Sequence, residues 1–148
     1  MTSELEDHVG YWLRFVSNHV SHAFALKLQT HEVTAAEWVV LRELFSRREA
    51  APSAIAERIG MTRGAITKLV DRLAAKALVT RLENAGDRRY QVLALTPAGR
   101  SLVPKLAALA DRNDAEFFGH LRPAQRAALE ELLKDVVQRH RFKTLPTA

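Results

Sequence analysis

The sequence has no cysteine, no signal-peptide pattern and no apolar run of about 18 residues, the length that a membrane helix needs. Without cysteine, the chain has no disulfide bonds, no thiolate metal ligands and no thiol-based redox sensor. The lack of a leader and of a membrane span predicts a cytoplasmic protein that does not enter a membrane.

The patterns that mark common enzyme classes are also missing. The chain carries no nucleophile elbow, no Gly-rich phosphate loop, no HExxH motif and no dinucleotide fingerprint. We therefore expect neither an enzyme nor a bound cofactor, and we assign no catalytic residue.

What the sequence does contain, at residues 52–71, is the pattern of a helix-turn-helix. Two helices that cross at a steep angle need a small residue where they touch and a permissive one at the turn, and Ala56 and Gly60 supply these. Thr62 is a suitable N-cap for the second helix. Apolar residues of both helices are spaced so that they share one core: Ile55, Ile59, Met61, Ile66 and Leu69.

The residues that follow predict a two-stranded wing. Residues 78–83 lead to a turn at residues 84–87, and a second strand returns with Leu93 and Leu95 on one face. Thr96 and Pro97 then begin another helix. A helix-turn-helix followed directly by a wing predicts a protein that binds double-stranded DNA.

The net charge of +5 is unevenly distributed along the chain. Residues 57–100 contain nine Lys and Arg against four Asp and Glu, whereas the remaining residues contain thirteen of each. A surface that binds a polyanion requires such a concentration, because phosphate contacts with counterion release supply most non-specific affinity. The alternative is a basic, solvated face without a partner, for which the charge would be spread along the chain.

Amphipathic helices are predicted on both sides of this region. Apolar residues three or four apart predict a long helix over residues 5–28, and Thr34 with Glu37 has the capping-box spacing that begins a second helix. A helix from Thr96 to about Phe118 contains Pro104, which we expect to bend it. A last helix follows Pro123, with its apolar face expected inward: Leu129, Leu132, Leu133, Val136 and Val137.

The predicted fold is therefore mainly α with a small β-wing, a winged helix-turn-helix with long N- and C-terminal helices. We divide it into an N-terminal dimerisation helix (1–33), a DNA-binding domain (34–99) and C-terminal dimerisation helices (100–148). The recognition helix spans about residues 62–76 and the wing about 79–95. The terminal helices have no obvious partner in so small a domain, so we expect a homodimer. The alternative is a monomer with these helices folded back on it.

The order of these elements resembles the MarR family of transcriptional regulators. The most specific part is the wing, where Asp-Arg-Arg at residues 87–89 precedes Leu-Thr-Pro-Ala-Gly at residues 95–99. Residues 70–81 match the usual end of the recognition helix and entry to the wing. The resemblance implies a homodimer, usually a repressor, with recognition helices in successive major grooves and wings in the flanking minor grooves. Two-fold symmetry predicts an inverted repeat with half-sites about 10 bp apart.

The first two turns of the recognition helix face the groove in this arrangement. Arg63 is expected to read guanine, and Ala65 to touch a thymine methyl. For Arg72 we expect either a phosphate contact or a structural role on its own helix. The residues expected at bases and nearby phosphates are Thr62, Arg63, Gly64, Thr67 and Lys68.

Three wing residues receive roles from the resemblance. Arg89 would enter the minor groove, where narrow A·T-rich stretches attract arginine, and Asp87 would anchor it electrostatically. Arg88 is expected in solvent or at a phosphate, because successive strand residues point to opposite faces. For Asp87 the alternative is ordinary turn chemistry, which does not explain the two arginines beside it.

The resemblance also implies a small effector, often aromatic or phenolic, between the dimerisation helices and the winged domain. The side chains that would line such a pocket and hold a carboxylate are Tyr11, Trp12, Phe15, His19, Trp38 and Arg42. The alternative assigns this aromatic stripe to the core and the interface between subunits.

Two further interpretations stay open. His19 and His22 lie three residues apart, and some MarR-type relatives sense zinc, but a zinc site needs three or four ligands. We assign no metal site and keep a metal-responsive regulator as an alternative. The second alternative is a winged helix that docks an acidic protein partner, although such a module has no need for Asp87 and Arg89 in this arrangement.

Overall fold

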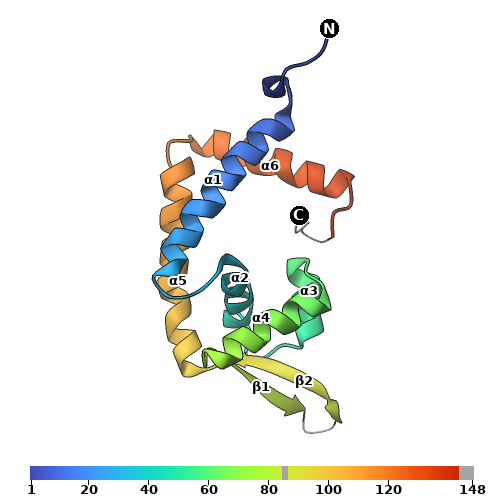
Figure 1. Cartoon of the computed structure of the whole chain (residues 1–148), viewed down its shortest axis with the longest axis vertical. Helices are drawn as coiled ribbons and strands as arrows, with labels where there is room; N and C mark the ends of the chain where they lie inside the picture. Colours follow the sequence, from blue (N-terminus) through green and yellow to red (C-terminus); the bar gives the residue numbers. More distant parts are fainter. Residues whose placement is uncertain (85–86, 144–148) are drawn as a thin grey trace.

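The computed structural model describes residues 1–84 and 87–143, and it confirms the prediction of a mainly helical chain with a small wing (Figure 1). A short 3-10 turn, Leu5–Asp7, precedes the first long helix. The sheet has two antiparallel strands. In chain order the remaining elements are α1 (Val9–Gln29), α2 (Ala35–Phe45), α3 (Pro52–Ile59), α4 (Arg63–Ala75), β1 (Val79–Asn84), β2 (Asp87–Leu95), α5 (Pro97–Phe118) and α6 (Pro123–Arg139).

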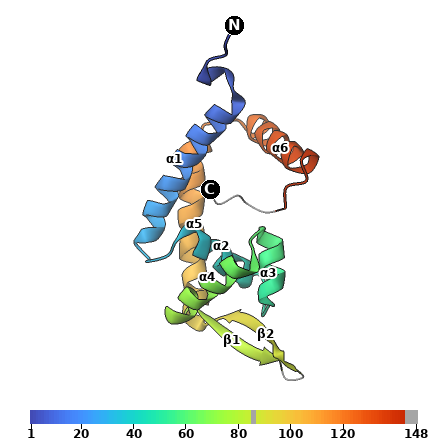
Figure 2. The ribbon, with the colours of Figure 1, turned by 45° about the vertical axis from the view of Figure 1, so that its right-hand side comes forward.

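The elements form two regions that share α5. The winged region consists of α2, α3, α4 and the sheet, and the terminal region consists of α1, α6 and the C-terminal half of α5 (Figures 1 and 2). Helix α5 contacts α2 and β2 in the winged region and α1 in the terminal region. The wing therefore lies at the opposite end of the molecule from α6.

The hydrophobic core lies in the winged region and extends to the end of α1 and the first half of α5. The helix-turn-helix contributes Ile55, Ala56, Ile66 and Leu69, as the spacing predicts. The other buried apolar residues are Leu28, Val33, Val40, Leu41, Leu44, Val70, Leu73, Val79, Leu93, Leu95, Val103 and Leu106.

The starts and turns of the winged region follow from local chemistry. Thr34 and Glu37 form the predicted capping box at the start of α2, and the Thr62 hydroxyl accepts a hydrogen bond from the Ala65 N–H at the start of α4. Gly60 ends α3 in the left-handed conformation, with φ 72°. The turn needs that conformation, and glycine adopts it at little cost.

The exit of the wing is held against the end of α4. The Thr96 hydroxyl donates to the Ala77 carbonyl (2.7 Å) and accepts from the Gly99 N–H (3.0 Å). A Cβ at Gly99 would overlap the Leu78 carbonyl oxygen. The Leu-Thr-x-x-Gly pattern thus joins the wing to α5, because only a glycine lets the two backbones approach so closely.

Helix α4 itself ends in a Schellman motif. The Leu78 N–H donates to the Leu73 carbonyl and the Ala77 N–H to the Ala74 carbonyl, both at 3.0 Å. Ala77 takes the left-handed conformation, φ 59°, that glycine usually occupies at this position. The Cβ of Ala77 makes this conformation unfavourable.

A polar cluster joins α1 to α5. Asn113, which is buried, donates to the Val20 carbonyl (3.2 Å) and accepts from the Lys27 ammonium (3.0 Å). The same ammonium pairs with Glu116 at 2.7 Å. These contacts fix the position of the second half of α1 along α5.

Two sequence predictions need correction. The face of α6 that was expected inward is largely exposed in the single chain, with Leu132 at 66% and Val136 at 49%. The first helix begins at Val9, because His8 has an extended backbone. Helix α5 runs to Phe118 with Pro104 inside it, as predicted, and the bend expected at Pro104 stays a prediction. The structure also contains a one-residue antiparallel bridge between Ala50 and Leu93 of β2. The sequence did not predict this bridge, because a single residue has no periodic pattern.

None of the helices in the described part of the chain is long and apolar enough to cross a membrane.

Candidate nucleic-acid interface

Helix α4 has one apolar face and one polar face. Ile66, Leu69, Val70 and Leu73 are buried. On the other face the residues expected at DNA are all exposed: Thr62, Arg63, Gly64, Thr67 and Lys68. The core therefore fixes which side of α4 is available to a partner.

Small or retracted side chains on this face of α4 leave room for a partner to approach the helix closely. Nothing lies within 4 Å of the position where a Cβ of Gly64 would be, so the surface there is open. The Thr67 hydroxyl donates to the Arg63 carbonyl (3.0 Å), which draws that side chain back against the helix. Among the described side chains, none forms an ion pair with Arg63 or Lys68. Both cations are thus available for phosphates or base edges.

Arg72 is exposed one turn beyond Lys68, and it too makes no ion pair within residues 1–83 and 91–143. Its neighbour Asp71 pairs with Arg81 on β1. This contact joins the polar side of α4 to the base of the wing. The sequence did not predict it, because the two charges lie ten residues apart across a turn.

The wing strands are antiparallel, with Val79 paired to Leu95 and Glu83 to Gln91. An irregularity follows Glu83, since Asn84 pairs with Asp87. The backbone of Asp87, Arg88 and Arg89 belongs to β2, and their side chains lie outside the described part of the structure. The roles predicted for these three side chains remain predictions.

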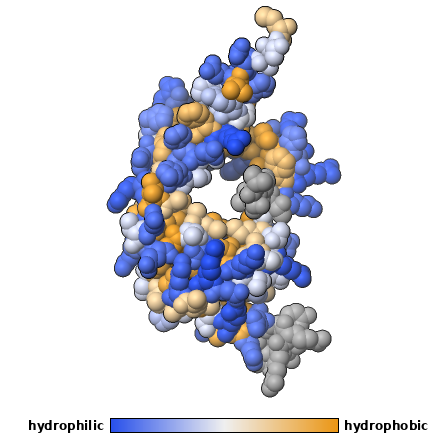
Figure 3. Space-filling view, in the orientation of Figure 1, coloured by the Kyte–Doolittle hydropathy of each residue, from blue (hydrophilic) through white to orange (hydrophobic). Residues whose placement is uncertain are grey.

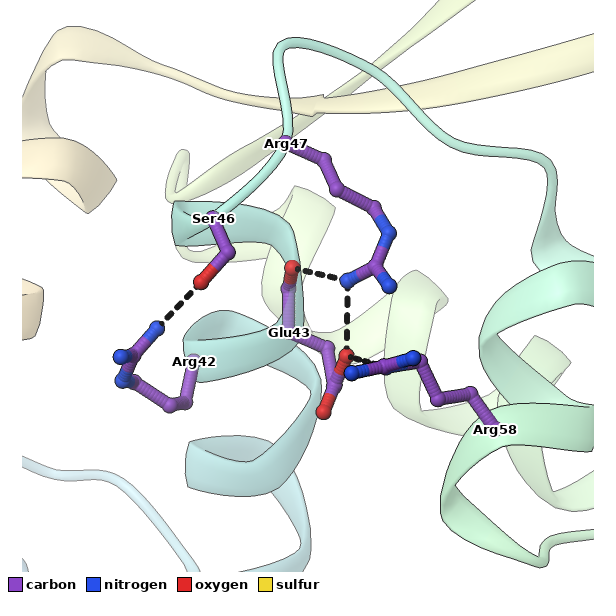
Figure 4. Close-up of polar contacts among 5 residues, drawn as sticks. All are labelled: Arg42, Glu43, Ser46, Arg47 and Arg58. Atoms are coloured by element: carbon purple, nitrogen blue, oxygen red, sulfur yellow. Dashed lines mark hydrogen bonds and ion pairs between the residues drawn. The ribbon is translucent and has the colours of Figure 1, made fainter.

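Two other arginines of the winged region are paired with one carboxylate. Glu43 on α2 accepts from Arg47 (2.7 Å) and from Arg58 on α3 (2.8 Å), which ties the end of α2 to α3 (Figure 4). Arg42 extends to the other side of α2 and donates to the Ser46 hydroxyl. Arg63, Lys68 and Arg72 on α4 differ from these two arginines, because no described side chain forms an ion pair with them.

An ion pair between Lys76 and a buried carboxylate, that of Glu37, lies at the far end of α4. The Lys76 ammonium contacts the Glu37 carboxylate at 2.9 and 3.1 Å and the Glu32 carbonyl at 2.6 Å. The Glu37 side chain is only 1% exposed. Burial by itself raises the pKa of Glu37, but hydrogen bonds from Lys76 and Thr34 favour the charged form, so the pKa lies below its ordinary value.

The residues expected at an effector lie in two groups in the single chain. Tyr11, Trp12, Phe15 and His19 form a row along α1, in which the Phe15 and His19 rings stack at 5.1 Å. On α2, Trp38 packs edge-on against Phe24, whereas Arg42 lies 5.7 Å from the centre of the Phe45 ring. Of these six, Phe15 and His19 line one groove of the described residues and Trp12 lines another, whereas Trp38 and Arg42 line neither.

Two apolar grooves lie where α1 meets the end of α5 and the start of α6. One, of about 480 Å³, contains Phe15 and His19 of the α1 row with Phe117, Phe118 and His120. The other, of about 400 Å³, contains Trp12 with Leu13, Val20 and Leu133. The space-filling view shows apolar surface on both sides of the opening between the two regions (Figure 3).

The histidines do not gather into a metal site. Within the part of the chain that the structure describes, no group of three or more His, Asp or Glu is placed to hold a metal ion. His19 and His22 are both exposed, as expected for histidines outside a core.

Comparisons with known proteins agree with this geometry. Residues 33–90 match the family model described as MarR family. The chain is 30% identical over 140 residues to the multiple antibiotic resistance protein MarR of Escherichia coli K12, covering 92% of this chain and 97% of that protein.

Solved structures with the same fold include proteins bound to DNA or regulated by a small molecule. BpsR of Bordetella bronchiseptica, whose DNA binding is regulated by 6-hydroxynicotinic acid, superposes with a TM-score of 0.83 at 26% identity, covering 92% of this chain and 97% of that one. A mutant of E. coli MarR complexed with operator DNA gives 0.81 at 25% identity, covering 92% and 99%.

Proposed function

The chain belongs to the MarR family of DNA-binding transcriptional regulators, and we propose that it binds an inverted-repeat operator as a homodimer, with α4 in the major groove. The observation that carries this proposal is the exposed polar face of α4. Arg63, Lys68 and Arg72 on that face are exposed and, among the described side chains, without an ion-pair partner. Cations left available on a helix surface suit phosphates and the O6 and N7 atoms of guanine.

The wing completes the proposed interface. Arg89 would enter the minor groove beside the α4 site, with Asp87 holding it in place and Arg88 near the phosphates. The ion pair of Asp71 with Arg81 supports this, because it fixes the base of the wing relative to α4.

The terminal helices are proposed as the dimer interface. Trp12, Leu13 and Val16 on α1 and Leu133 and Val137 on α6 are each more than 40% exposed. Exposed apolar surface of this extent is unfavourable in water, and a second copy would bury it. The two recognition helices would then face half-sites about 10 bp apart.

We further propose that a small aromatic or phenolic effector controls a repressor, and that the protein acts in the cytoplasm. The regulation of BpsR by 6-hydroxynicotinic acid supports this class of ligand. The α1 row and the α2 residues Trp38 and Arg42 lie in different groups in one chain, so we place the pocket where a partner subunit would complete it.

The test is selection of duplex DNA by the purified protein, followed by affinity measurements on the selected site. We expect an inverted repeat. Arg63→Ala is expected to weaken binding to that site by about 1–3 kcal/mol and to relax sequence preference, and Arg89→Ala to lower the salt slope by about one unit. Arg112→Ala, an exposed arginine on α5, is the matched control.

The alternatives make different predictions for the same experiment. A protein-docking module would select no sequence, and neither variant would differ from the wild type. The relatives described above are DNA-binding regulators, which disfavours the protein-docking interpretation.

A further inference from the structure

Lys76 is the first residue beyond α4, and its side chain returns toward the core. Its ammonium has three N–H donors, and three oxygens lie within reach: the Glu32 carbonyl and both Glu37 carboxylate oxygens, at 2.6 to 3.1 Å. All three donors are therefore occupied. Although the side chain is 36% exposed, its charge is not directed at the solvent.

The partner Glu37 has little freedom to move. Its carboxylate is buried and also accepts from the Thr34 N–H (3.0 Å), as part of the capping box that begins α2. A buried carboxylate is strongly unfavourable without a hydrogen-bonded partner. The buried Glu37 carboxylate thus needs Lys76 as its partner. Because the carboxylate is held at the start of α2, the Lys76 ammonium is held there too.

The third acceptor belongs to a different element. Glu32 lies in the turn between α1 and α2 and has a positive φ of 57°. That turn is held by hydrogen bonds from the Glu32 N–H to the Gln29 carbonyl and from the His31 N–H to the Leu28 carbonyl, at the end of α1. One ammonium therefore joins the end of α1, the start of α2 and the end of α4.

We infer that Lys76 and Glu37 are positioning residues for DNA recognition, which set the place of α4 relative to the α1–α2 corner. This rests on the proposed role of α4 in the major groove. Apolar contacts such as those of Leu69 and Leu73 fix the face of α4, although the hydrophobic effect itself has no direction. Charged hydrogen bonds do have direction, and those of Lys76 hold the C-terminal end of α4 in one orientation.

A phosphate contact and a positioning role of Lys76 predict different effects of the same substitutions on DNA binding. If Lys76 contacted a DNA phosphate, Lys76→Arg would preserve binding, because the charge is kept. As a positioning residue it requires the lysine geometry, since a planar guanidinium cannot place its donors on the same three oxygens. Glu37→Gln separates the roles further: removing a negative charge favours DNA electrostatically, whereas loss of position weakens specific binding.

The experiment measures the affinity of full-length wild type, Lys76→Arg, Lys76→Met and Glu37→Gln for the selected operator and for random duplex, between about 50 and 250 mM salt. We expect all three variants to lose about 3- to 30-fold on the operator and little on random DNA, with the salt slope unchanged. The matched controls are Glu57→Gln on α3 and Lys105→Met on α5, both exposed. Lys105→Met is expected to keep wild-type operator affinity, and Glu57→Gln to keep or slightly raise it, because it too removes a negative charge.

The outcomes that would overturn the inference are distinct. Equal losses of Lys76→Met on operator and random DNA, with a slope lower by about one unit, would make Lys76 a phosphate contact. Wild-type or tighter operator binding by Glu37→Gln would remove its positioning role. If a variant unfolds, as thermal melting would show, Lys76→Arg decides alone. A wild type that selects no operator contradicts the proposed function, not this inference.

Discussion

The winged region and the terminal helices both carry helical apolar patterns, but only the winged region buries most of its pattern within one chain. Leu41, Leu44, Ile55 and Leu73 are fully buried. On α1 the only buried residue is Leu28, at the end next to the winged region, and α6 has none. Helical periodicity thus indicates which face is apolar, and it does not indicate whether the same chain covers it.

The largest effect should come from placing a charge in the terminal region. Leu133→Asp introduces a carboxylate where the proposed second copy would pack, so we expect monomers with about 10²- to 10⁴-fold weaker operator binding, because the two half-sites are no longer linked. Light scattering gives the molar mass. Gln138→Asp, which places the same group at an exposed polar position of α6, is the control. A Leu133→Asp protein of unchanged dimer mass would contradict the proposed interface.

The next effect compares equal truncations in the two regions. In the Leu133→Asp background, Leu41→Ala should lower the free energy of unfolding by about 2–5 kcal/mol, because it leaves a cavity in the core. Leu132→Ala, at a position that is 66% exposed, should change it by less than about 0.5 kcal/mol. Urea unfolding measures both. Equal losses would mean that α6 packs on its own chain.

The ion pair of Lys76 with the buried Glu37 carboxylate predicts a pH dependence in the winged region. The pKa of Glu37 is below its ordinary value of 4.5, so its contribution to stability is present above pH 4.5 and is lost as the pH falls through the lowered pKa. Glu37→Gln should therefore be less stable at pH 7, by roughly 1–3 kcal/mol, and the difference should shrink on acidification below pH 4.5. Urea unfolding at a series of pH values measures this, with Glu57→Gln as the control. A difference that is constant with pH would assign the loss to packing.

The smallest effect concerns one backbone position. Ala77→Gly should raise the free energy of unfolding by about 0.5–1 kcal/mol, because it relieves the left-handed conformation of Ala77. Ala75→Gly, at the last residue of α4, should lower it by about 0.5–1 kcal/mol. Thermal or urea unfolding of the two variants should give opposite signs, and a shared sign would exclude strain at Ala77.

Features set by neighbours in the sequence could be predicted from it. The capping box of Thr34 and Glu37, the turn at Gly60 and the cap at Thr62 depend on residues two to four positions apart. Their chemistry is the same in any fold. The exposed face of α4 was predictable for the same reason, because the apolar spacing fixes the buried side.

Contacts between distant charges could not be predicted. Glu37 meets Lys76 and Asp71 meets Arg81 only because α2, α4 and β1 are packed together. The sequence contains many acids and bases, and nothing local selects one pair. The apolar face of α6 was identified correctly as a face, but its expected burial failed in the single chain, because periodicity does not say which surface covers a face.

Helix α5 spans both regions, so a tilt at one of its ends moves the other end. With 22 residues it is about 33 Å long. A tilt of about 6° at the α6 end therefore displaces the wing end by about 3.4 Å, the rise of one base pair along a DNA strand. A small angular change of α5 is therefore enough to move the two recognition helices out of register with their half-sites on the DNA.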